Sequence, residues 1–364
     1  MLGSSRLKST LSGQAFITFC PLLLPVWNMT SLPYELLAMI FDEHANDLFT
    51  LHSCILVNRT WCMAALQLLW AKPFTLLYSS PSRRNNRLVE NLLATFTECF
   101  TDVDALNNAS RLRKKYSKKF PLDYSLYLKE IHPGDIYSLA AQTNKHYCVR
   151  KIARLAIKYC PNVETLSLTS PNILIDQNQF LVSIKSLPRL QNLSLYFHSA
   201  GNIFNILSKV AHNLKSISVK VCWDGVYTFE KRSPYGLQKL IQSQHQLKTF
   251  TIQTVTVKMR PLFKLLESQS NSLKSLVFEY VYFDYDDSNI EPIKFHQLTS
   301  IHIKNCQILG GLGSIFEADL PKLEKLDFED TEWRHKSDWI PLRNKYGSRI
   351  VYPHDPLLMH WMLC

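Results

Sequence analysis

The chain has 364 residues, of which 46% are hydrophobic and 20% charged, and only ten are glycines. This composition is that of a globular protein of two or three domains with a sizeable core, and it excludes a largely disordered chain. The net charge of +11 reflects either a solvated Lys-rich surface or an acidic partner, such as a nucleic acid or an acidic protein face. Nine cysteines at irregular spacing, without a CxxC pair, indicate no zinc site and favour a reducing compartment.

The first 28 residues contain an apolar stretch at 15–27 that resembles a secretory signal peptide. However, Pro21 and Pro25 interrupt the stretch, no small-x-small cleavage site follows it, and it is too short to span a bilayer. Met29 directly precedes the first recognisable domain. We therefore expect residues 1–28 to be an upstream extension of the gene model, with a cleaved leader as the alternative.

Residues 32–70 predict three short helices, because their apolar residues recur at helical spacing and Pro33 suits a first helical turn. Forty residues have too little interior to bury all of these side chains. Either the next domain covers the remaining apolar side chains, or these side chains form an exposed patch that binds a partner. The side chains in question are Leu32, Pro33, Ile40, Phe41, Leu51, Trp61 and Trp70.

This segment resembles the F-box in its Leu32-Pro33 start, its Ile40-Phe41 pair, its Val57-Asn58-Arg59-x-Trp61 motif and its Leu69-Trp70 end. Asn58 stands where many members of that family have Cys. The resemblance implies docking on a Skp-type adaptor and, through it, on a cullin–RING (SCF) ubiquitin ligase. The contact residues that it implies are Leu32, Pro33, Leu36, Ile40, Phe41, Leu51, Val57, Asn58, Trp61, Leu69 and Trp70.

The connector that follows, residues 75–123, predicts a helix at 87–100. The basic run Arg111–Lys119 is either a solvated loop, which we expect, or a nuclear signal or nucleic-acid patch. Residues 121–131 suggest a strand that opens the next domain. Residues 147–159 read as an amphipathic helix that caps the end of that domain's core.

One pattern, L-x-x-L-x-L with conservative replacements, recurs seven times in the remaining chain. Its copies begin at residues 163, 190, 214, 247, 273, 298 and 323, an interval close to the roughly 20–29 residues of leucine-rich repeats. In each copy the last two apolar residues share one face of a strand, and the residues between and beside them share the other. Helical segments such as 203–210 and 237–242 close the core.

The expected fold class is therefore α/β: a small helical F-box followed by a leucine-rich-repeat solenoid, with parallel strands on its concave face and helices on its convex face. The whole chain looks similar to the expanded fungal group of F-box and leucine-rich-repeat proteins. After the repeats we expect a helix at 337–346 that Gly347 ends, and a capping strand at 349–352. The expected domains are 1–28 (leader), 29–74 (F-box), 75–123 (connector) and 124–364 (repeats with caps).

The sequence carries no Walker-type phosphate loop, no zinc-ligand pairs and no nucleophile elbow. We therefore expect no enzyme, no cofactor and no metal. The leading hypothesis is a substrate-recruiting adaptor of an SCF-type ligase in the cytoplasm, the nucleus or both. A secreted leucine-rich-repeat protein and a nuclear nucleic-acid binder are the alternatives. We expect neither a membrane nor a nucleic acid as a partner.

The target protein is expected on the concave face of the repeats, where solenoids commonly bind. Short Ser and Thr side chains dominate that face, and larger residues collect where the strands end. These larger side chains either anchor the target or pack between neighbouring turns. The candidate anchors are Tyr196, Trp223, Tyr280, Tyr282 and His302.

Overall fold

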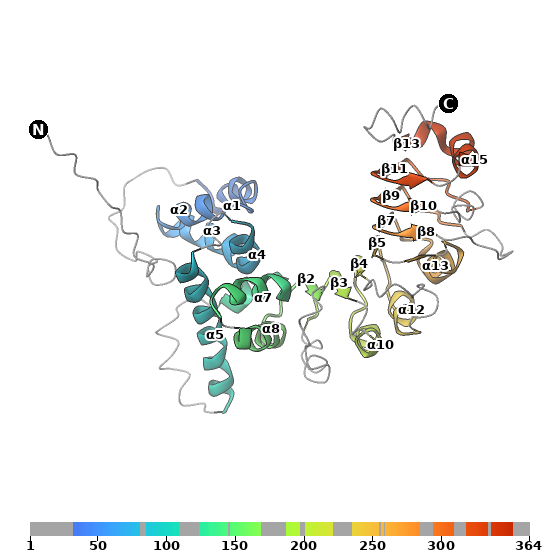
Figure 1. Cartoon of the computed structure of the whole chain (residues 1–364). Coiled ribbons are helices and arrows are strands. Elements are labelled where there is room, and N and C mark those ends of the chain that lie inside the picture. Colours follow the sequence, from blue (N-terminus) through green and yellow to red (C-terminus); the bar gives the residue numbers. More distant parts are fainter. Residues whose placement is uncertain are drawn as a thin grey trace, which may run out of the picture. The chain divides into compact units, whose positions relative to one another are not determined.

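The computed structural model describes residues 32–80, 85–108, 124–144, 146–168, 187–196, 201–220, 235–254, 256–257, 259–283, 294–308, 318–333 and 336–351 (Figure 1). The expected leader, the basic run Arg111–Lys119 and Trp223 lie outside these residues. The chain forms two compact units, Met1–Val163 and Glu164–Cys364. Each unit is described by itself.

The described residues of the first unit are helical apart from one two-residue strand. Its three N-terminal helices confirm the helices predicted over residues 32–70; α1 and α2 each pack against α3.

Helix α7 packs against α4 and α5, and α8 packs against α5 and α7. For this reason residues 124–163 belong to the first compact unit, whereas the sequence suggested that the repeat domain begins at residue 124. The elements are α1 (Tyr34–Asp42), α2 (Leu48–Ile55), α3 (Arg59–Ala71), α4 (Pro73–Ser79), α5 (Asn86–Asn108), η2 (Tyr124–Leu126), β1 (Glu130–Ile131), α7 (Pro133–Gln142) and α8 (His146–Tyr159).

Polar side chains fix where two of these helices begin. The Asp47 carboxylate accepts hydrogen bonds from the backbone N–H groups of Phe49 (3.0 Å) and Thr50 (3.2 Å) at the start of α2. The Asn58 side-chain oxygen accepts one from the Trp61 N–H (3.0 Å) at the start of α3. Each cap satisfies backbone donors that have no partner within the helix. Asn58 therefore has a structural role that the sequence motif alone did not show.

The second unit is a repeating α/β structure built on one parallel sheet. Seven of its strands coincide with the seven L-x-x-L-x-L copies, which confirms those strand predictions. Neighbouring strands pair in the order in which they occur in the chain, so the sheet grows by one strand with each repeat. These strands are β2 (Thr165–Leu168), β3 (Asn192–Tyr196), β4 (Ser216–Lys220), β5 (Thr249–Gln253), β7 (Ser275–Glu279), β9 (Ser300–Lys304), β11 (Lys325–Glu329) and the final β13 (Ile350–Val351).

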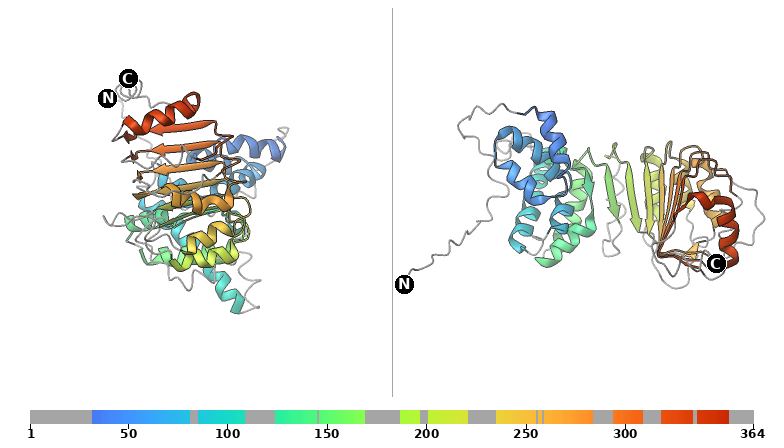
Figure 2. Two further views of the ribbon diagram at one scale, coloured as in Figure 1. Left: turned by 90° about the vertical axis from the view of Figure 1, so that its right-hand side faces the viewer. Right: turned by 90° about the horizontal axis from the view of Figure 1, so that it is seen from above.

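Alternation of side chains along each strand places the core on one side of the sheet. In β7, for example, Leu276 and Phe278 are fully buried, whereas Ser275, Val277 and Glu279 are half-buried on the opposite face. Helices lie along the buried side (Figure 2) and complete the core. These helices are α10 (Gly201–Val210), α12 (Tyr235–Gln242) and α13 (Met259–Leu266), which η4 (Glu267–Gln269) extends.

A second, smaller sheet follows the ends of the main strands, and the sequence analysis did not predict it. It consists of two-residue parallel strands in the order β12-β10-β8-β6. The residue just after each of β5, β7, β9 and β11 has a left-handed backbone, with φ of 56°, 55°, 50° and 49° at Thr254, Tyr280, Asn305 and Asp330. This turn redirects the chain into β6 (Thr256–Val257), β8 (Tyr282–Phe283), β10 (Gln307–Ile308) and β12 (Glu332–Trp333).

The ends of the repeat region agree only in part with the sequence prediction. The predicted C-terminal helix is α15 (Lys336–Tyr346), and the predicted capping strand is β13. The strand expected over residues 121–131 is reduced, within its described part, to Glu130–Ile131, and Tyr124–Leu126 forms a 3-10 helix instead. Helix α13 was not predicted, although Leu262, Phe263 and Leu266 have helical spacing and are buried.

Candidate functional site

Helix α1 has two apolar faces, and one of them is exposed. Leu37 and Phe41, four residues apart, are buried in the first unit. Leu36, Met39 and Ile40, at the spacing of a second helix face, are 46%, 68% and 48% exposed. An amphipathic surface helix normally presents polar residues to solvent. The outward face of α1 is therefore the first candidate for an interaction surface.

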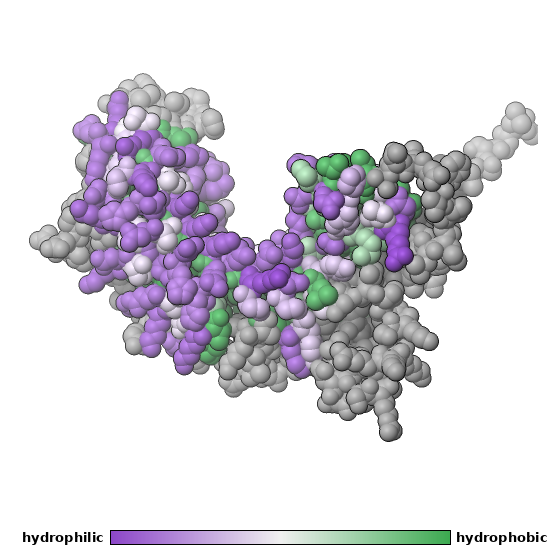
Figure 3. Space-filling model, turned by 180° about the vertical axis from the view of Figure 1, so that it is seen from behind, coloured by the Kyte–Doolittle hydropathy of each residue, from purple (hydrophilic) through white to green (hydrophobic). Residues whose placement is uncertain are grey.

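Exposed apolar residues also lie on and just after α2 and at the start of α1. Phe49 on α2 and Leu56 and Val57 just after it are exposed, as are Leu32 and Tyr34 at the start of α1. In Figure 3, apolar atoms gather on the first unit around α1 and α2, whereas the visible surface of the second unit is mainly hydrophilic. We define the α1–α2 patch as Leu32, Tyr34, Leu36, Met39, Ile40, Phe49, Leu56 and Val57.

Several of the expected docking residues lie inside the first unit. Phe41 and Trp61 contact each other edge to face, with ring centroids 5.2 Å apart, which links α1 to α3. Trp70 stacks on Phe96 of α5 at 6.0 Å, so for Trp70 the next part of the chain supplies the cover. The buried members of the expected set are Phe41, Leu51, Leu69 and Trp70. Because they are buried, they cannot contact a partner directly in this conformation and instead pack beneath the patch. Trp61 is half-buried, and Leu32, Pro33, Leu36, Ile40, Val57 and Asn58 are exposed.

The second candidate surface is the face of the main sheet opposite the helices. Neutral Thr, Ser and Asn side chains occupy the first two outward positions of β2 to β5. At the third outward position, β4 has Lys220 and β5 has Gln253, and Glu279, Lys304 and Glu329 follow in register on β7, β9 and β11. Charged side chains are most frequent on β7, β9 and β11, which we call the charged half of the face.

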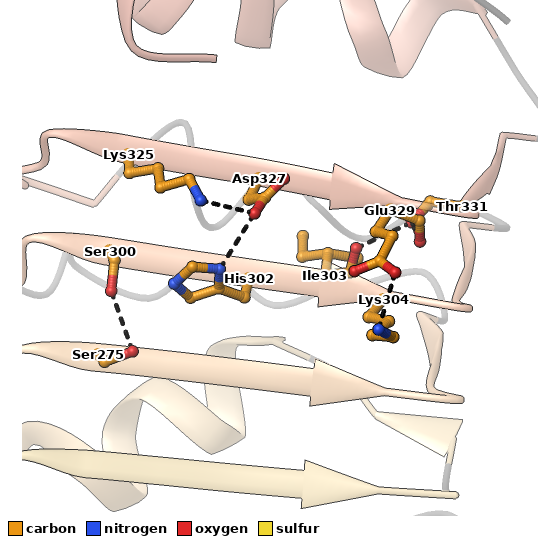
Figure 4. Close-up of polar contacts among 9 residues, drawn as sticks. All are labelled: Ser275, Ser300, His302, Ile303, Lys304, Lys325, Asp327, Glu329 and Thr331. Carbon is orange, nitrogen blue, oxygen red and sulfur yellow. Dashed lines mark hydrogen bonds and ion pairs between the residues drawn. The ribbon is translucent and has the colours of Figure 1, made fainter. Parts of the chain in front are cut away.

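A hydrogen-bonded network organises the charged half (Figure 4). The Asp327 carboxylate lies 2.9 Å from the Lys325 Nζ and 3.3 Å from the His302 Nδ1. The Ser300 hydroxyl donates to the Ser275 hydroxyl at 2.9 Å and not to His302. Ser300 therefore lacks the hydrogen bond to His302 by which a histidine base activates a serine, although Ser, His and Asp are close together. The hydrogen bonds hold these side chains in place on the sheet face.

The structure describes the side chains of three of the five expected anchor residues, Tyr280, Tyr282 and His302. Tyr280 is 54% exposed at the end of β7, whereas Tyr282 in β8 is half-buried. His302 lies on the sheet face as part of the polar network. Tyr196 ends β3, but its side chain lies outside the described part, as does all of Trp223. Of the two tyrosines among them whose side chains are described, Tyr280 is the more exposed.

Two buried polar positions that the sequence analysis did not single out connect consecutive repeats. The Cys306 thiol donates to the Lys304 carbonyl (3.1 Å) and accepts from the Val281 N–H (3.4 Å), and burial raises its pKa to about 11. One repeat later, the Thr331 hydroxyl donates to the Ile303 carbonyl at 3.1 Å. Both residues stand three positions after the last apolar residue of their L-x-x-L-x-L copy. A longer repeat template that includes this position would have found them.

The described residues meet neither the requirements of a metal site nor those of a membrane-spanning helix. They contain no group of three or more His, Cys, Asp or Glu side chains arranged to hold a metal ion. Among the described helices, none combines the length and the apolar character needed to cross a bilayer.

Comparison with known proteins adds no relative. The sequence matches no protein-family model and no curated protein. Its function is therefore inferred from the residues and the geometry described above.

Proposed function

We propose that the protein is a non-enzymatic adaptor of an SCF-type cullin–RING ubiquitin ligase. In this proposal the first three helices are an F-box that docks on a Skp-type adaptor, and the second unit is a leucine-rich-repeat solenoid that holds the target protein. The ligase would then modify the target because both are held close together.

The observation that carries the proposal is the α1–α2 patch. It combines an outward apolar helix face with exposed Phe49, Leu56 and Val57 on a folded three-helix unit whose other apolar helix residues are buried or half-buried. Exposed apolar patches of this kind mark protein interaction sites. Leu32, Leu36, Ile40 and Val57 belong both to this patch and to the residues that the F-box resemblance implies as contacts.

The repeat geometry supports the role proposed for the second unit. Each L-x-x-L-x-L copy supplies one strand of a single parallel sheet, and helices line one side of that sheet. Cys306 and Thr331 stand where the leucine-rich-repeat pattern has Asn or Cys. Both form hydrogen bonds with backbone groups of the preceding repeat. The sheet face opposite the helices is left for a target.

We expect a Leu36→Glu/Ile40→Glu double variant to bind a purified Skp-type adaptor at least about 100-fold more weakly than the natural chain. Both side chains are exposed, so the substitutions leave the helical core unchanged. Apolar anchors of an interface typically contribute about 2 kcal/mol or more each, and about 1.4 kcal/mol corresponds to a factor of ten in affinity. Isothermal titration calorimetry with the purified adaptor measures the effect.

The matched control is Leu126→Glu, which makes the same kind of change at a leucine that is 49% exposed and lies outside the patch. This control should bind the adaptor as the natural chain does. Equal binding by the double variant, or no binding by the natural chain, would show that the α1–α2 patch is not an adaptor-docking surface.

A further inference from the structure

The carboxyl ends of strands β7, β9 and β11 form a second exposed surface with its own character. There the chain turns through the left-handed residues Tyr280, Asn305 and Asp330 and enters the small second sheet. We define the Tyr280 rim as Glu279, Tyr280, Lys304, Glu329, Asp330 and Glu332.

Tyr280 is the first observation that points to a ligand. Its side chain is 54% exposed, although a tyrosine ring gains stability from burial. The equivalent positions in the next two repeats hold Asn305 and Asp330, residue types that tolerate a left-handed backbone better than tyrosine does. The turn therefore does not require tyrosine, and its exposed ring offers a face that attracts cations.

The charge of the rim is the second, independent observation. The rim residues carry four carboxylates and one ammonium group, so their net charge is 1 − 4 = −3, whereas the net charge of the whole chain is +11. The Lys304 Nζ lies 2.7 Å from a Glu329 oxygen. The pKa of Lys304 is raised, first by the hydrogen bond and charge of Glu329 and to a lesser degree by Glu279 and Tyr280. Asp330 and Glu332 are exposed, and the Glu332 carboxylate accepts a hydrogen bond from the uncharged Gln307 amide at 2.8 Å.

We propose that the Tyr280 rim binds an extended, arginine-bearing segment of a partner protein. Arginine fits better than lysine, because its planar guanidinium group stacks on an aromatic ring and pairs with a carboxylate through two hydrogen bonds. The negative rim repels phosphate groups, so a nucleic acid does not fit this surface. This inference deepens the proposed function, since the segment would belong to the target.

Spacing along the rim restricts the sequence of the segment. Neighbouring strands lie about 4.8 Å apart, so Tyr280 and Asp330, two strands apart in the sheet order, are separated by about 10 Å. In the extended polyproline II conformation the chain has three residues per turn and rises about 3.1 Å per residue, so side chains three positions apart share a face and lie about 9 Å apart. Arginines at every third position of such a segment would therefore meet the ring and the carboxylates in turn.

The probe for this proposal is a fluorescein-labelled ten-residue peptide of serine and glycine with arginine at every third position. The full-length chain should bind it in a fluorescence anisotropy titration at low salt, and the affinity should fall as salt is added. The same peptide with citrulline in place of arginine keeps the shape and loses the charge, so we expect it to bind at least about tenfold more weakly. Equal affinity for both peptides, or no binding of the arginine peptide, would overturn the proposal.

Substitutions that suit the backbone locate the site. We expect Tyr280→Asn to weaken arginine-peptide binding about fivefold or more, since asparagine already occupies the equivalent turn at Asn305. Asp330→Asn/Glu332→Gln should weaken it about tenfold or more. The control Glu324→Gln removes one exposed carboxylate just before β11, away from the rim, and should change affinity less than twofold. Rim variants that bind as tightly as the natural chain would contradict the proposal.

This test is independent of adaptor docking. Leu36→Glu/Ile40→Glu leaves the rim intact, so that variant should bind the arginine peptide normally. Peptide binding without adaptor binding would overturn the ligase role and keep the rim as a site. Adaptor binding without peptide binding would overturn the rim alone.

Discussion

Replacing Phe278 by alanine is expected to lower the free energy of unfolding of the second unit by about 3–5 kcal/mol, the usual loss for a fully buried phenylalanine. Phe278 in β7 is fully buried, and its ring contacts the ring of Phe283 in β8 edge to face at 5.2 Å. The pair therefore joins the main sheet to the small one. Truncation leaves a cavity at this junction and removes the aromatic contact.

Urea unfolding of the full chain, followed by circular dichroism, measures this loss. The control is Val277→Ala on the same strand, where the side chain is half-buried on the opposite face. We expect that change to cost less than about 1 kcal/mol. Similar losses for the two variants would mean that Phe278 does not lie at the junction described here.

Replacing Gln269 by leucine should cost about 2–4 kcal/mol, although leucine has nearly the same volume and is more apolar. The buried Gln269 amide donates to the carbonyls of Ile241 (2.9 Å) and Gln244 (3.0 Å). Its side-chain oxygen accepts from the Leu247 N–H at 3.3 Å. Leucine leaves these backbone groups without their partner, and each such buried group costs about 1–3 kcal/mol.

The same arrangement occurs one repeat earlier, where the buried Gln244 amide donates to the Ala211 carbonyl (2.7 Å) and its oxygen accepts from the Leu214 N–H (3.0 Å). These glutamines connect consecutive turns. Gln242→Leu at the exposed end of α12 is the matched control and should change stability by less than about 0.5 kcal/mol. If Gln269→Leu stabilises the chain in a thermal unfolding experiment, the glutamine bonds are not a source of stability.

The strands of the second unit could be predicted from the sequence because their signal is local and repeated. Phe250 and Ile252, for example, alternate with polar neighbours, and apolar residues return at the same two positions of every repeat. The final helix and capping strand followed from their position after the last copy. For Leu32 and Ile40 in the α1–α2 patch, the surplus of apolar side chains over what three short helices can bury left two outcomes, cover by the next domain or exposure, and the structure shows exposure.

Other features depend on contacts between residues far apart in the chain. The F-box resemblance implied Trp70 as a contact residue, but its ring stacks on Phe96 of α5. Helical spacing does not show which face of α3 a later helix will cover. The small sheet has strands of only two residues, too short for a periodic pattern. Gln269 resembles any polar loop residue until the preceding repeat is placed beside it.

The most direct test of the proposed ligase role is hydrogen–deuterium exchange of the full chain with and without a saturating amount of purified Skp-type adaptor. Adaptor binding should slow exchange in α1 and in residues 48–57, where the α1–α2 patch lies, and leave strands β5 to β11 unchanged. Unchanged exchange in α1 and α2 at saturating adaptor would contradict the assignment of this patch as the docking surface.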